Sequence, residues 1–255
     1  MKIISAAAAA VSLTALAAAI YKWKGKKNDE EPEVYCTCHR PSLPKDFTIT
    51  AHTGCMGTKA NSVDSIIAAD AAGADIVEFD LRFDKSGTPV LTHDAHYDKN
   101  TVTLAQAFGV LSGLKLRVNI DVKDTAYLEK VPPLAEEYGL KDRIFFTGIG
   151  KDFVPAVKEK CPDIPYYLNL NILPHLPDDE KYVESVIKQL RDSGAVGLNT
   201  NRLNVTAKLV RAVQDAGFPV SVWTATTAAQ IHKAAAAGPD NITTKDPALA
   251  AKLCR

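Results

Sequence analysis

Two acidic residues, Glu78 and Asp80, lie two positions apart in a segment, 75–83, in which apolar and acidic residues alternate. A period of two is typical of a β-strand, and side chains two apart on a strand share one face. Two carboxylates held together in a protein interior repel each other and lose hydration, and a divalent cation offsets both costs. The segment therefore predicts a cation site, with an edge strand that carries a polar face as the alternative.

Further residues with useful chemistry follow other apolar runs. His52 and His93 each come directly after a short apolar run, and imidazole titrates near neutral pH, where a general acid or base is needed. Asp121 and Lys123 share one face of a further strand-like segment, 116–123. Carboxylate oxygens suit Ca²⁺ or Mg²⁺ better than zinc, and an ammonium group pairs with phosphate oxygens. The candidate metal ligands are Glu78, Asp80 and Asp121, and the candidate catalytic residues are His52, His93 and Lys123.

From residue 47 onward, short β-type runs alternate with segments of helical periodicity, and many of the helical segments stop at a glycine. The predicted strands are 47–51, 75–83, 87–92, 116–123, 143–147, 165–170, 195–199, 219–224 and 241–244. The predicted helices are 62–72, 103–111, 126–138 with a bend or restart at Pro132, 153–160, 179–192, 204–216, 227–237 and 247–253.

This alternation requires parallel strand pairing and right-handed crossovers. About eight strand–helix units fit a (β/α)8 TIM barrel, whose active site lies at the carboxyl ends of the strands. A doubly wound open sheet is the second choice, because the segment 54–57 lacks the spacing of a glycine-rich phosphate loop. The polar residues at the predicted strand ends are His52, Glu78, Asp80, His93, Asp121, Lys123, Asn169, Asn171, Asn199, Trp223, Thr224 and Lys245.

The composition of the 255-residue chain narrows the class of protein. Thirty basic and thirty acidic residues cancel, so no whole-protein field favours nucleic acid as a partner. Hydrophobic residues make up 46% of the chain, which suits a globular domain with a sizeable core. The five cysteines are scattered and odd in number, which does not indicate a disulfide framework.

The amino terminus is a separate feature. The stretch 3–20 is apolar and uncharged, just long enough to span a bilayer, and four lysines follow it by residue 27. We expect an N-terminal hydrophobic helix that anchors the protein in a membrane, and a secretory signal removed by cleavage is the alternative. The lysines favour a cytoplasmic barrel, although the acidic residues that follow leave the side of the membrane open. The predicted organisation is a membrane anchor or signal segment at 1–24, a linker at 25–46 and the barrel at 47–255.

The order and spacing of several motifs resemble the glycerophosphodiester phosphodiesterase family, a branch of the phosphatidylinositol-phospholipase-C-like TIM barrels. The resemblance runs from about residue 48 to the end of the chain. The motifs that carry it are His52-Thr53-Gly54, Ala60-Asn61-Ser62, Gly73-Ala74-Asp75-Ile76-Val77-Glu78-Phe79-Asp80-Leu81, Ser86-Gly87-Thr88-Pro89-Val90-Leu91-Thr92-His93-Asp94, Asn119-Ile120-Asp121-Val122-Lys123, Val222-Trp223-Thr224 and Asn241-Ile242-Thr243-Thr244-Lys245-Asp246-Pro247.

The resemblance implies metal-dependent hydrolysis of glycerophosphodiesters to glycerol 3-phosphate and an alcohol. It implies that His52 is the general base and His93 the general acid, and that the substrate's own glycerol hydroxyl attacks phosphorus to give a cyclic phosphate that water opens. It also implies a divalent cation, Ca²⁺ or Mg²⁺, and a small-molecule or lipid-derived phosphodiester as substrate. The substrate contacts that it implies are Thr53, Asn61 and Trp223, the last as an apolar wall against the glycerol.

Three departures from the family pattern bear on the substrate. Thr53 replaces an arginine, which removes a bidentate phosphate contact. Ala60 replaces a glutamate at or near the metal, and Asp121 is shorter than the more usual glutamate. Lys59, Arg82 and Lys245 are candidates to replace the missing arginine. Two other functions stay open. One is a phospholipase-type lyase that releases a cyclic phosphate, and the other, suggested by Thr53 and Ala60, is a non-catalytic barrel that binds phosphodiesters. Headgroup choice and oligomeric state are not specified by the sequence.

Overall fold

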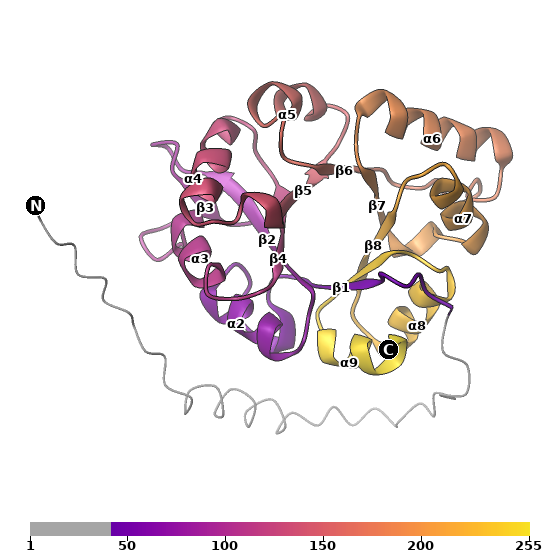
Figure 1. Cartoon of the computed structure of the whole chain (residues 1–255), viewed down its shortest axis with the longest axis horizontal. Helices are drawn as coiled ribbons and strands as arrows, with labels where there is room; N and C mark the ends of the chain where they lie inside the picture. Colours follow the sequence, from indigo (N-terminus) through magenta and orange to yellow (C-terminus); the bar gives the residue numbers. More distant parts are fainter. Residues whose placement is uncertain (1–41) are drawn as a thin grey trace, which may run out of the picture. The chain divides into compact units, whose positions relative to one another are not determined.

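The strands of the protein are short runs rich in apolar and β-branched residues. In the computed structural model, which describes residues 42–255, eight of them pair in parallel, and β1 pairs with both β2 and β9, so that the sheet closes into a barrel (Figure 1). The parallel strands are β1 (Thr48–Ala51), β2 (Ile76–Phe83), β4 (Arg117–Val122), β5 (Ile144–Ile149), β6 (Tyr166–Asn169), β7 (Gly197–Asn201), β8 (Val220–Ala225) and β9 (Asn241–Thr244). The predicted TIM barrel is confirmed, and the open sheet is excluded.

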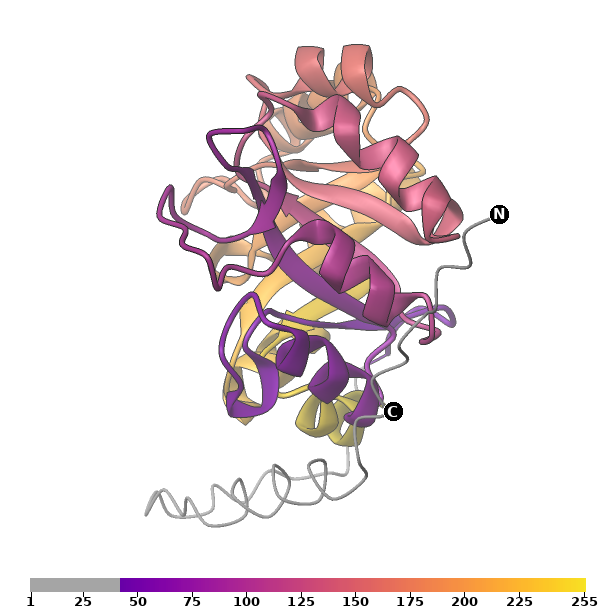
Figure 2. The same cartoon turned by 90° about the vertical axis from the view of Figure 1, so that its left-hand side faces the viewer.

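The helices pack along the outside of the strands, as the side view shows (Figure 2). Six of them begin with a Ser, Thr or Asp whose side chain accepts a backbone N–H of the first turn, which is how such residues favour helix starts. The helices are α2 (Val63–Ala71), α3 (Leu104–Leu111), α4 (Val131–Glu137), α5 (Val154–Lys160), α6 (Glu180–Ser193), α7 (Ala207–Asp215), α8 (Ala228–Ala236) and α9 (Pro247–Cys254).

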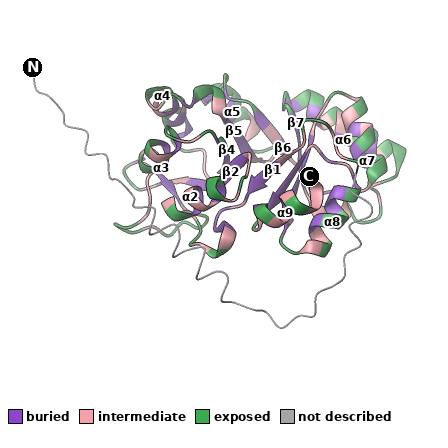
Figure 3. Ribbon diagram, turned by 60° about the horizontal axis from the view of Figure 1, so that its bottom comes forward, coloured by how far each residue is buried: buried purple, intermediate pink, exposed green. Residues whose placement is uncertain are grey.

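Strand β2 is buried on both faces. Phe79 and Leu81 are buried in the hydrophobic core, whereas Glu78 and Asp80, which point to the opposite face, are each only 4% exposed. Buried residues concentrate on the strands and on the helix faces that cover them (Figure 3). Because β2 also pairs with β1 and β4, the alternative of a polar edge strand is wrong, and the two carboxylates are held inside the barrel.

A short strand, β3 (Pro89–Leu91), pairs antiparallel with the end of β2 through Leu81↔Leu91 and Phe83↔Pro89. The chain turns back at Gly87 and returns to the carboxyl end of β2. This return brings the segment that follows β3, including His93, to the same mouth of the barrel as the end of β2.

The structure differs from the predicted elements mainly at their ends. The predicted strand 195–199 begins two residues later, because Gly194 closes helix α6 in a left-handed conformation and the chain needs two further residues to enter the sheet. A short 3-10 turn at Leu128–Lys130 precedes α4, which restarts at the prolines as predicted.

The predicted N-terminal helix, 1–24, and the linker up to residue 41 lie outside the described residues, so the membrane anchor stays a prediction. Within residues 42–255, no helix has the length and hydropathy needed to cross a bilayer.

Candidate active site

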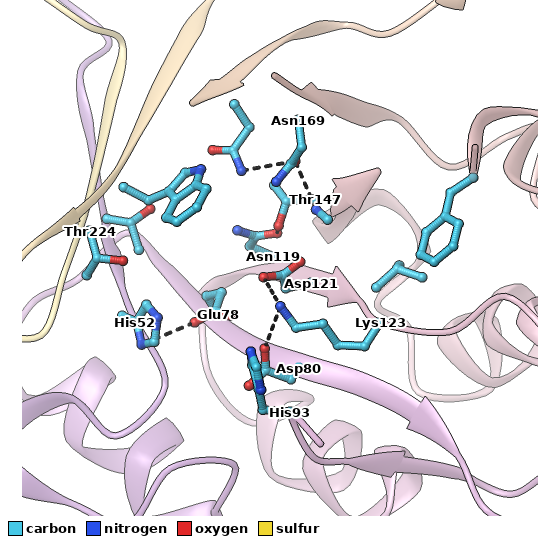
Figure 4. A pocket seen from close by; sticks show the side chains of 16 residues that line it. His52, Glu78, Asp80, His93, Asn119, Asp121, Lys123, Thr147, Asn169 and Thr224 are labelled. Carbon is cyan, nitrogen blue, oxygen red and sulfur yellow. Dashed lines mark hydrogen bonds and ion pairs between the residues drawn. The ribbon is translucent and has the colours of Figure 1, made fainter. Parts of the chain in front are cut away.

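Polar side chains from the carboxyl ends of the strands surround a cavity of about 490 Å³ (Figure 4). All six residues predicted as metal ligands or catalytic groups line it: His52, Glu78, Asp80, His93, Asp121 and Lys123. The structure therefore brings together residues that are up to 71 positions apart in the chain, between His52 and Lys123.

The three carboxylates are held together by the register of the sheet. Asp80 on β2 pairs directly with Asp121 on β4, and Glu78 lies two residues before Asp80 on the same face. One oxygen from each of the three carboxylates lies within 4.8 Å of the others. The Nζ atom of Lys123 lies 2.8 Å from Asp121 Oδ2 and 3.2 Å from Asp80 Oδ1. The cluster thus contains three potential anions and one cation.

Burial dominates the electrostatics of this cluster. Burial raises the pKa of Glu78 well above its usual value, and repulsion from Asp80 and Asp121 raises it further. Burial also raises the pKa of Asp121, although the ammonium group of Lys123 acts in the opposite direction. For Lys123 burial alone would lower the pKa, but the neighbouring Asp121 and Asp80 outweigh it and the pKa is raised. The ammonium group of Lys123 therefore stays charged. Its single positive charge is not enough to neutralise three ionised carboxylates.

A divalent cation fits this donor set. When all three carboxylates are ionised, the ammonium of Lys123 neutralises one of them and two negative charges remain. One divalent ion neutralises these two charges. Ca²⁺ binds oxygens at about 2.3–2.6 Å, so ligand oxygens on opposite sides of one ion lie about 5 Å apart, which agrees with the observed cluster. In addition, Asp121 Oδ1 is buried and has no hydrogen-bond partner within residues 42–255. The all-oxygen set fits Mg²⁺ or Ca²⁺ and does not fit a zinc site built from nitrogen and sulfur.

Thr53 and Asn61 hold two of the three carboxylates in place by hydrogen bonds. The Thr53 N–H donates to Glu78 Oε2 at 2.8 Å, and Asn61 Nδ2 donates to Asp80 Oδ2 at 2.9 Å. The Asn61 N–H in turn donates to Thr53 Oγ1 at 2.6 Å. Thr53 is only 3% exposed, and neither residue lines the cavity. The backbone N–H of Thr53 thus holds Glu78, the Asn61 side chain holds Asp80, and the Thr53 hydroxyl is engaged by Asn61. The structure gives both residues a supporting role, and their predicted contact with substrate stays a prediction.

His52 is placed as a proton acceptor. Its backbone N–H donates to Thr244 O, which fixes it at the end of β1, and its Nδ1 lies 2.9 Å from Thr53 O. A neutral ring that donates its Nδ1–H to this carbonyl leaves Nε2 unprotonated. Burial lowers the pKa of His52, so the neutral form is favoured at neutral pH.

His93 lies at the open rim of the same cavity. Its side chain is 67% exposed, and its Nδ1 lies 2.8 Å from Asp94 Oδ1. The Nε–H of Arg82 donates to the His93 carbonyl at 2.8 Å, and the Thr92 N–H donates to Asp80 O at 3.1 Å. Arg82, a candidate phosphate contact in the sequence, thus anchors the segment that carries His93.

In the other half of the cavity wall, Trp223 was the one residue predicted as a site residue. Thr147 Oγ1 donates to Asn119 Oδ1 at 2.8 Å, and Asn169 Oδ1 accepts from the Gly148 N–H at 2.9 Å. Trp223 lines the cavity as predicted. Asn169, Asn199 and Thr224 stood at predicted strand ends, which was the available signal, but nothing in their spacing pointed to a ligand.

Gly148 has a role that no motif indicated. Its φ is +75°, and a Cβ at this position would overlap Asp121 Oδ1 and lie 2.5 Å from Val122 O. Only glycine therefore lets β5 approach the carboxylate of β4 this closely.

The closed barrel and its polar mouth, in which two histidines lie beside an acidic cluster, place the protein in the class of (β/α)8 barrels. Comparison with known proteins narrows this class. The model of the glycerophosphoryl diester phosphodiesterase family matches residues 50–125 and 104–249. A glycerophosphodiester phosphodiesterase from Caldanaerobacter subterraneus subsp. tengcongensis is 23% identical over 245 residues, which cover 81% of this chain and 97% of that protein.

Two solved structures share the fold. A protein from Silicibacter pomeroyi assigned as a glycerophosphoryl diester phosphodiesterase superposes with a TM-score of 0.72 at 18% identity, over 84% of this chain and 95% of that one. A phosphodiesterase from Oleispira antarctica, in complex with the product sn-glycerol-3-phosphate, gives a TM-score of 0.66 at 18% identity, over 83% and 96% of the two chains. The chain belongs to the glycerophosphoryl diester phosphodiesterase family, and it is by that membership a phosphoric diester hydrolase.

Proposed function

We propose that the protein hydrolyses glycerophosphodiesters to glycerol 3-phosphate and an alcohol, with Mg²⁺ or Ca²⁺ held by Glu78, Asp80 and Asp121. The observation that carries the proposal is the convergence of these three carboxylates with His52, His93 and Lys123 on one cavity at the mouth of the barrel. A site that only bound phosphodiesters would need neither two titrating imidazoles nor a buried acidic cluster. When bound, the cation would polarise the phosphoryl oxygen and stabilise the charge that develops on it.

The first half of the reaction uses both histidines. His52 Nε2 takes the proton of the glycerol hydroxyl next to the phosphate ester, and the hydroxyl oxygen forms a bond to phosphorus. The bond from phosphorus to the departing alcohol breaks, and His93 donates a proton to the alcohol oxygen. Lys123 stabilises the charge on the phosphoryl oxygens as it is redistributed. The product of this half-reaction is a cyclic phosphate and a free alcohol.

The second half-reaction reverses the proton transfers. His93, now unprotonated, takes a proton from water, whose oxygen bonds to phosphorus. The ring P–O bond to the glycerol oxygen breaks, and His52 returns its proton to that oxygen. Both histidines end in their starting states, and the product is glycerol 3-phosphate.

Phosphorus NMR of the purified full-length protein with glycerophosphocholine and Mg²⁺ or Ca²⁺ tests the proposal. We expect the diester signal to be replaced by that of glycerol 3-phosphate. Accumulation of a cyclic phosphate that is never opened would identify a lyase instead. An unchanged diester in the presence of a folded protein that still binds it would identify a binding protein.

A further inference from the structure

His93 is held in place by its backbone rather than by burial. Its side chain is 67% exposed, and within residues 42–255 the ring has Asp94 as its one hydrogen-bond partner. Two hydrogen bonds fix the backbone around it. The Thr92 N–H donates to Asp80 O at 3.1 Å, and the Nε–H of Arg82 donates to the His93 carbonyl at 2.8 Å. The position of the imidazole therefore depends on the segment that carries these two bonds.

Both bonds depend on the hairpin formed by β2 and β3. Arg82 belongs to β2, and Thr92 directly follows β3. The two strands pair over three residue pairs, one of which contains Pro89, a residue without an N–H to donate. On its other edge β3 has an isolated bridge between Val90 and Thr103 and one further backbone hydrogen bond. A two-stranded hairpin is marginally stable by itself, so contacts at its tip matter for its position.

The turn at the tip of the hairpin has a fixed shape. Asp84 Oδ1 accepts the N–H groups of Ser86 and Thr88, each at 2.8 Å, and the Gly87 N–H donates to Asp84 O at 2.9 Å. Gly87 has a φ of +76°, which glycine adopts without strain. These bonds set the shape of the turn but not its place relative to the rest of the barrel.

Lys130 and Tyr127, here called the clamp, fix this turn to the next loop of the barrel. Both lie between β4 and α4, and Lys130 Nζ donates to Gly87 O at 2.6 Å. The same ammonium lies 4.8 Å from the centroid of the Tyr127 ring, within range of a cation–π interaction. The Tyr127 ring packs edge-on against Phe83, the last residue of β2, with the two centroids 5.9 Å apart.

The clamp lies directly against the turn. A Cβ on Gly87 would lie 2.7 Å from Lys130 Nζ and 3.0 Å from Cδ1 of the Tyr127 ring, and Gly87 is buried although it belongs to a turn. Neither Lys130 nor Tyr127 lines the cavity. The two side chains therefore act on the hairpin and not on the substrate.

We infer that Lys130 and Tyr127 are positioning residues for the general acid, which hold His93 within reach of the leaving alcohol by fixing the β2–β3 hairpin to the loop after β4. The acid role of His93 rests on the proposed function, whereas the link from the clamp to the hairpin does not. The loop that carries the clamp follows the strand of Asp121, so the clamp ties the acid to the acidic cluster. A displacement of about 1 Å in a catalytic group can cost about 100-fold in rate.

Substrates with different leaving groups test the inference. The choline oxygen of glycerophosphocholine must be protonated as it leaves, whereas p-nitrophenol leaves as a stable anion and needs no acid. Lys130→Met removes the ammonium and keeps most of the side-chain length. We expect kcat/KM to fall by about 10- to 100-fold for glycerophosphocholine and by less than about threefold for the p-nitrophenyl ester of glycerol 3-phosphate. Because kcat/KM reports the first half-reaction alone, the opening of the cyclic phosphate does not enter the comparison.

His93→Ala gives the full size of this difference between the substrates. It should lower kcat/KM for glycerophosphocholine by about 10²- to 10⁴-fold, far more than for the p-nitrophenyl ester. If His93→Ala shows the difference and Lys130→Met lowers both substrates equally or neither, the inference is overturned. If His93→Ala itself affects both substrates equally, the acid role in the proposed function is wrong.

Hydrogen exchange followed by NMR tests the clamp without turnover. The Thr92 amide proton reports whether the segment before His93 stays bonded to the end of β2, and the Leu198 amide proton, bonded to Pro219 O, reports global opening. In Lys130→Met the Thr92 proton should exchange about 10-fold faster relative to that of Leu198. An unchanged ratio would overturn the inference even in an active enzyme. A changed ratio in a protein that hydrolyses neither diester would contradict the proposed function and support the link from the clamp to the hairpin.

Conservative and distant variants make the test specific. Lys130→Arg keeps a cationic donor and Tyr127→Phe keeps the ring, so both should behave as the wild-type protein, whereas Tyr127→Ala should behave as Lys130→Met. Lys208→Met is the matched control, because Lys208 Nζ donates to another backbone carbonyl, that of Asp178, and does not line the cavity. It should change neither the substrate ratio nor the exchange ratio. Changes of the same size in Lys208→Met would show that they do not arise from the clamp and would overturn the inference.

Discussion

His52 Nδ1 lies 3.8 Å from Glu78 Oε2, and the two residues come from the adjacent parallel strands β1 and β2. The same Glu78 oxygen accepts the backbone N–H of Thr53, the residue that follows the histidine. The proton acceptor and the acidic cluster are therefore joined through one peptide unit, so that the position of the imidazole relative to the carboxylates does not depend on a flexible loop. His93, in contrast, depends on Arg82 to hold its segment at the rim.

Replacing His52 by alanine should remove the general base. We expect kcat to fall by about 10²- to 10⁴-fold, the usual contribution of general acid–base catalysis, while the melting temperature changes little. His175→Ala is the control, because His175 is exposed on the segment between β6 and α6 and does not line the cavity. The measurement is steady-state turnover of glycerophosphocholine. Near-normal turnover in His52→Ala would rule out the role assigned to the imidazole.

The pH dependence of kcat/KM should report the same imidazole. Because burial lowers the pKa of His52, its base form persists below the ordinary value of 6.5 for histidine. Activity should rise with pH and reach half of its plateau below pH 6.5, and in His52→Ala this acidic limb should disappear. A limb centred above that value, or one that persists in the variant, would assign the titration to another group.

Glu78→Gln should raise the stability of the cation-free protein and weaken cation binding. Since the pKa of Glu78 is raised in the folded state, the cation-free folded protein holds this proton more tightly than the unfolded chain does. The free energy of unfolding therefore falls as pH rises from the ordinary value of 4.5 through the raised value, and the loss is complete above it. Without cation, Glu78→Gln should melt at a higher temperature than the wild-type protein at pH 8 and should differ less at pH 5.

The same variant should lose most of the stabilisation that added Mg²⁺ or Ca²⁺ gives the wild-type protein, because stabilisation follows binding to the folded state. Glu184→Gln, an exposed carboxyl on α6, provides the comparison and should leave both behaviours unchanged. Thermal melts with EDTA and with added cation measure both effects. A Glu78→Gln protein that is less stable at pH 8 without cation would contradict the repulsion described above.

Gly148→Ala should disturb Asp121 directly. The new Cβ would overlap Asp121 Oδ1, and the alanine would be held at a strained positive φ. We therefore expect a loss of roughly 1–3 kcal/mol in the free energy of unfolding and a marked loss of activity. Gly139→Ala has a similar φ of +67° but meets no atom within 4 Å, so it should show the backbone strain without the loss of activity. Equal activity in the two variants would show that the close approach to Asp121 has no catalytic importance.

Much of the fold and the main site were predictable from the sequence, because both depend on local patterns. The alternation in 75–83 placed Glu78 and Asp80 on one strand face, and the strand–helix repeat placed the polar strand ends at one mouth. The strand register that places Asp80 beside Asp121 could not be predicted from the sequence, because it depends on how the strands pair across the sheet.

The position of Thr53 outside the cavity lining was not predictable for a related reason. A strand-end residue next to a catalytic histidine is expected to face the substrate, but the chain turns after His52 and directs the Thr53 hydroxyl to the backbone of Asn61. Gly148 and the wall formed by Asn169 and Asn199 were missed because their roles arise only from contacts between strands that are distant in sequence.

The proposed reaction requires a cation that is held by the acidic cluster of Glu78, Asp80 and Asp121. The direct measurement is kcat/KM for glycerophosphocholine on protein stripped with EDTA and then titrated with Mg²⁺ or Ca²⁺. We predict negligible activity in the stripped protein and a saturable rise to full activity with one of the ions, with sn-glycerol 3-phosphate as product and no such rise in Glu78→Gln. Full activity in the stripped protein, or a folded protein that stays inactive at every concentration of both ions, would contradict it.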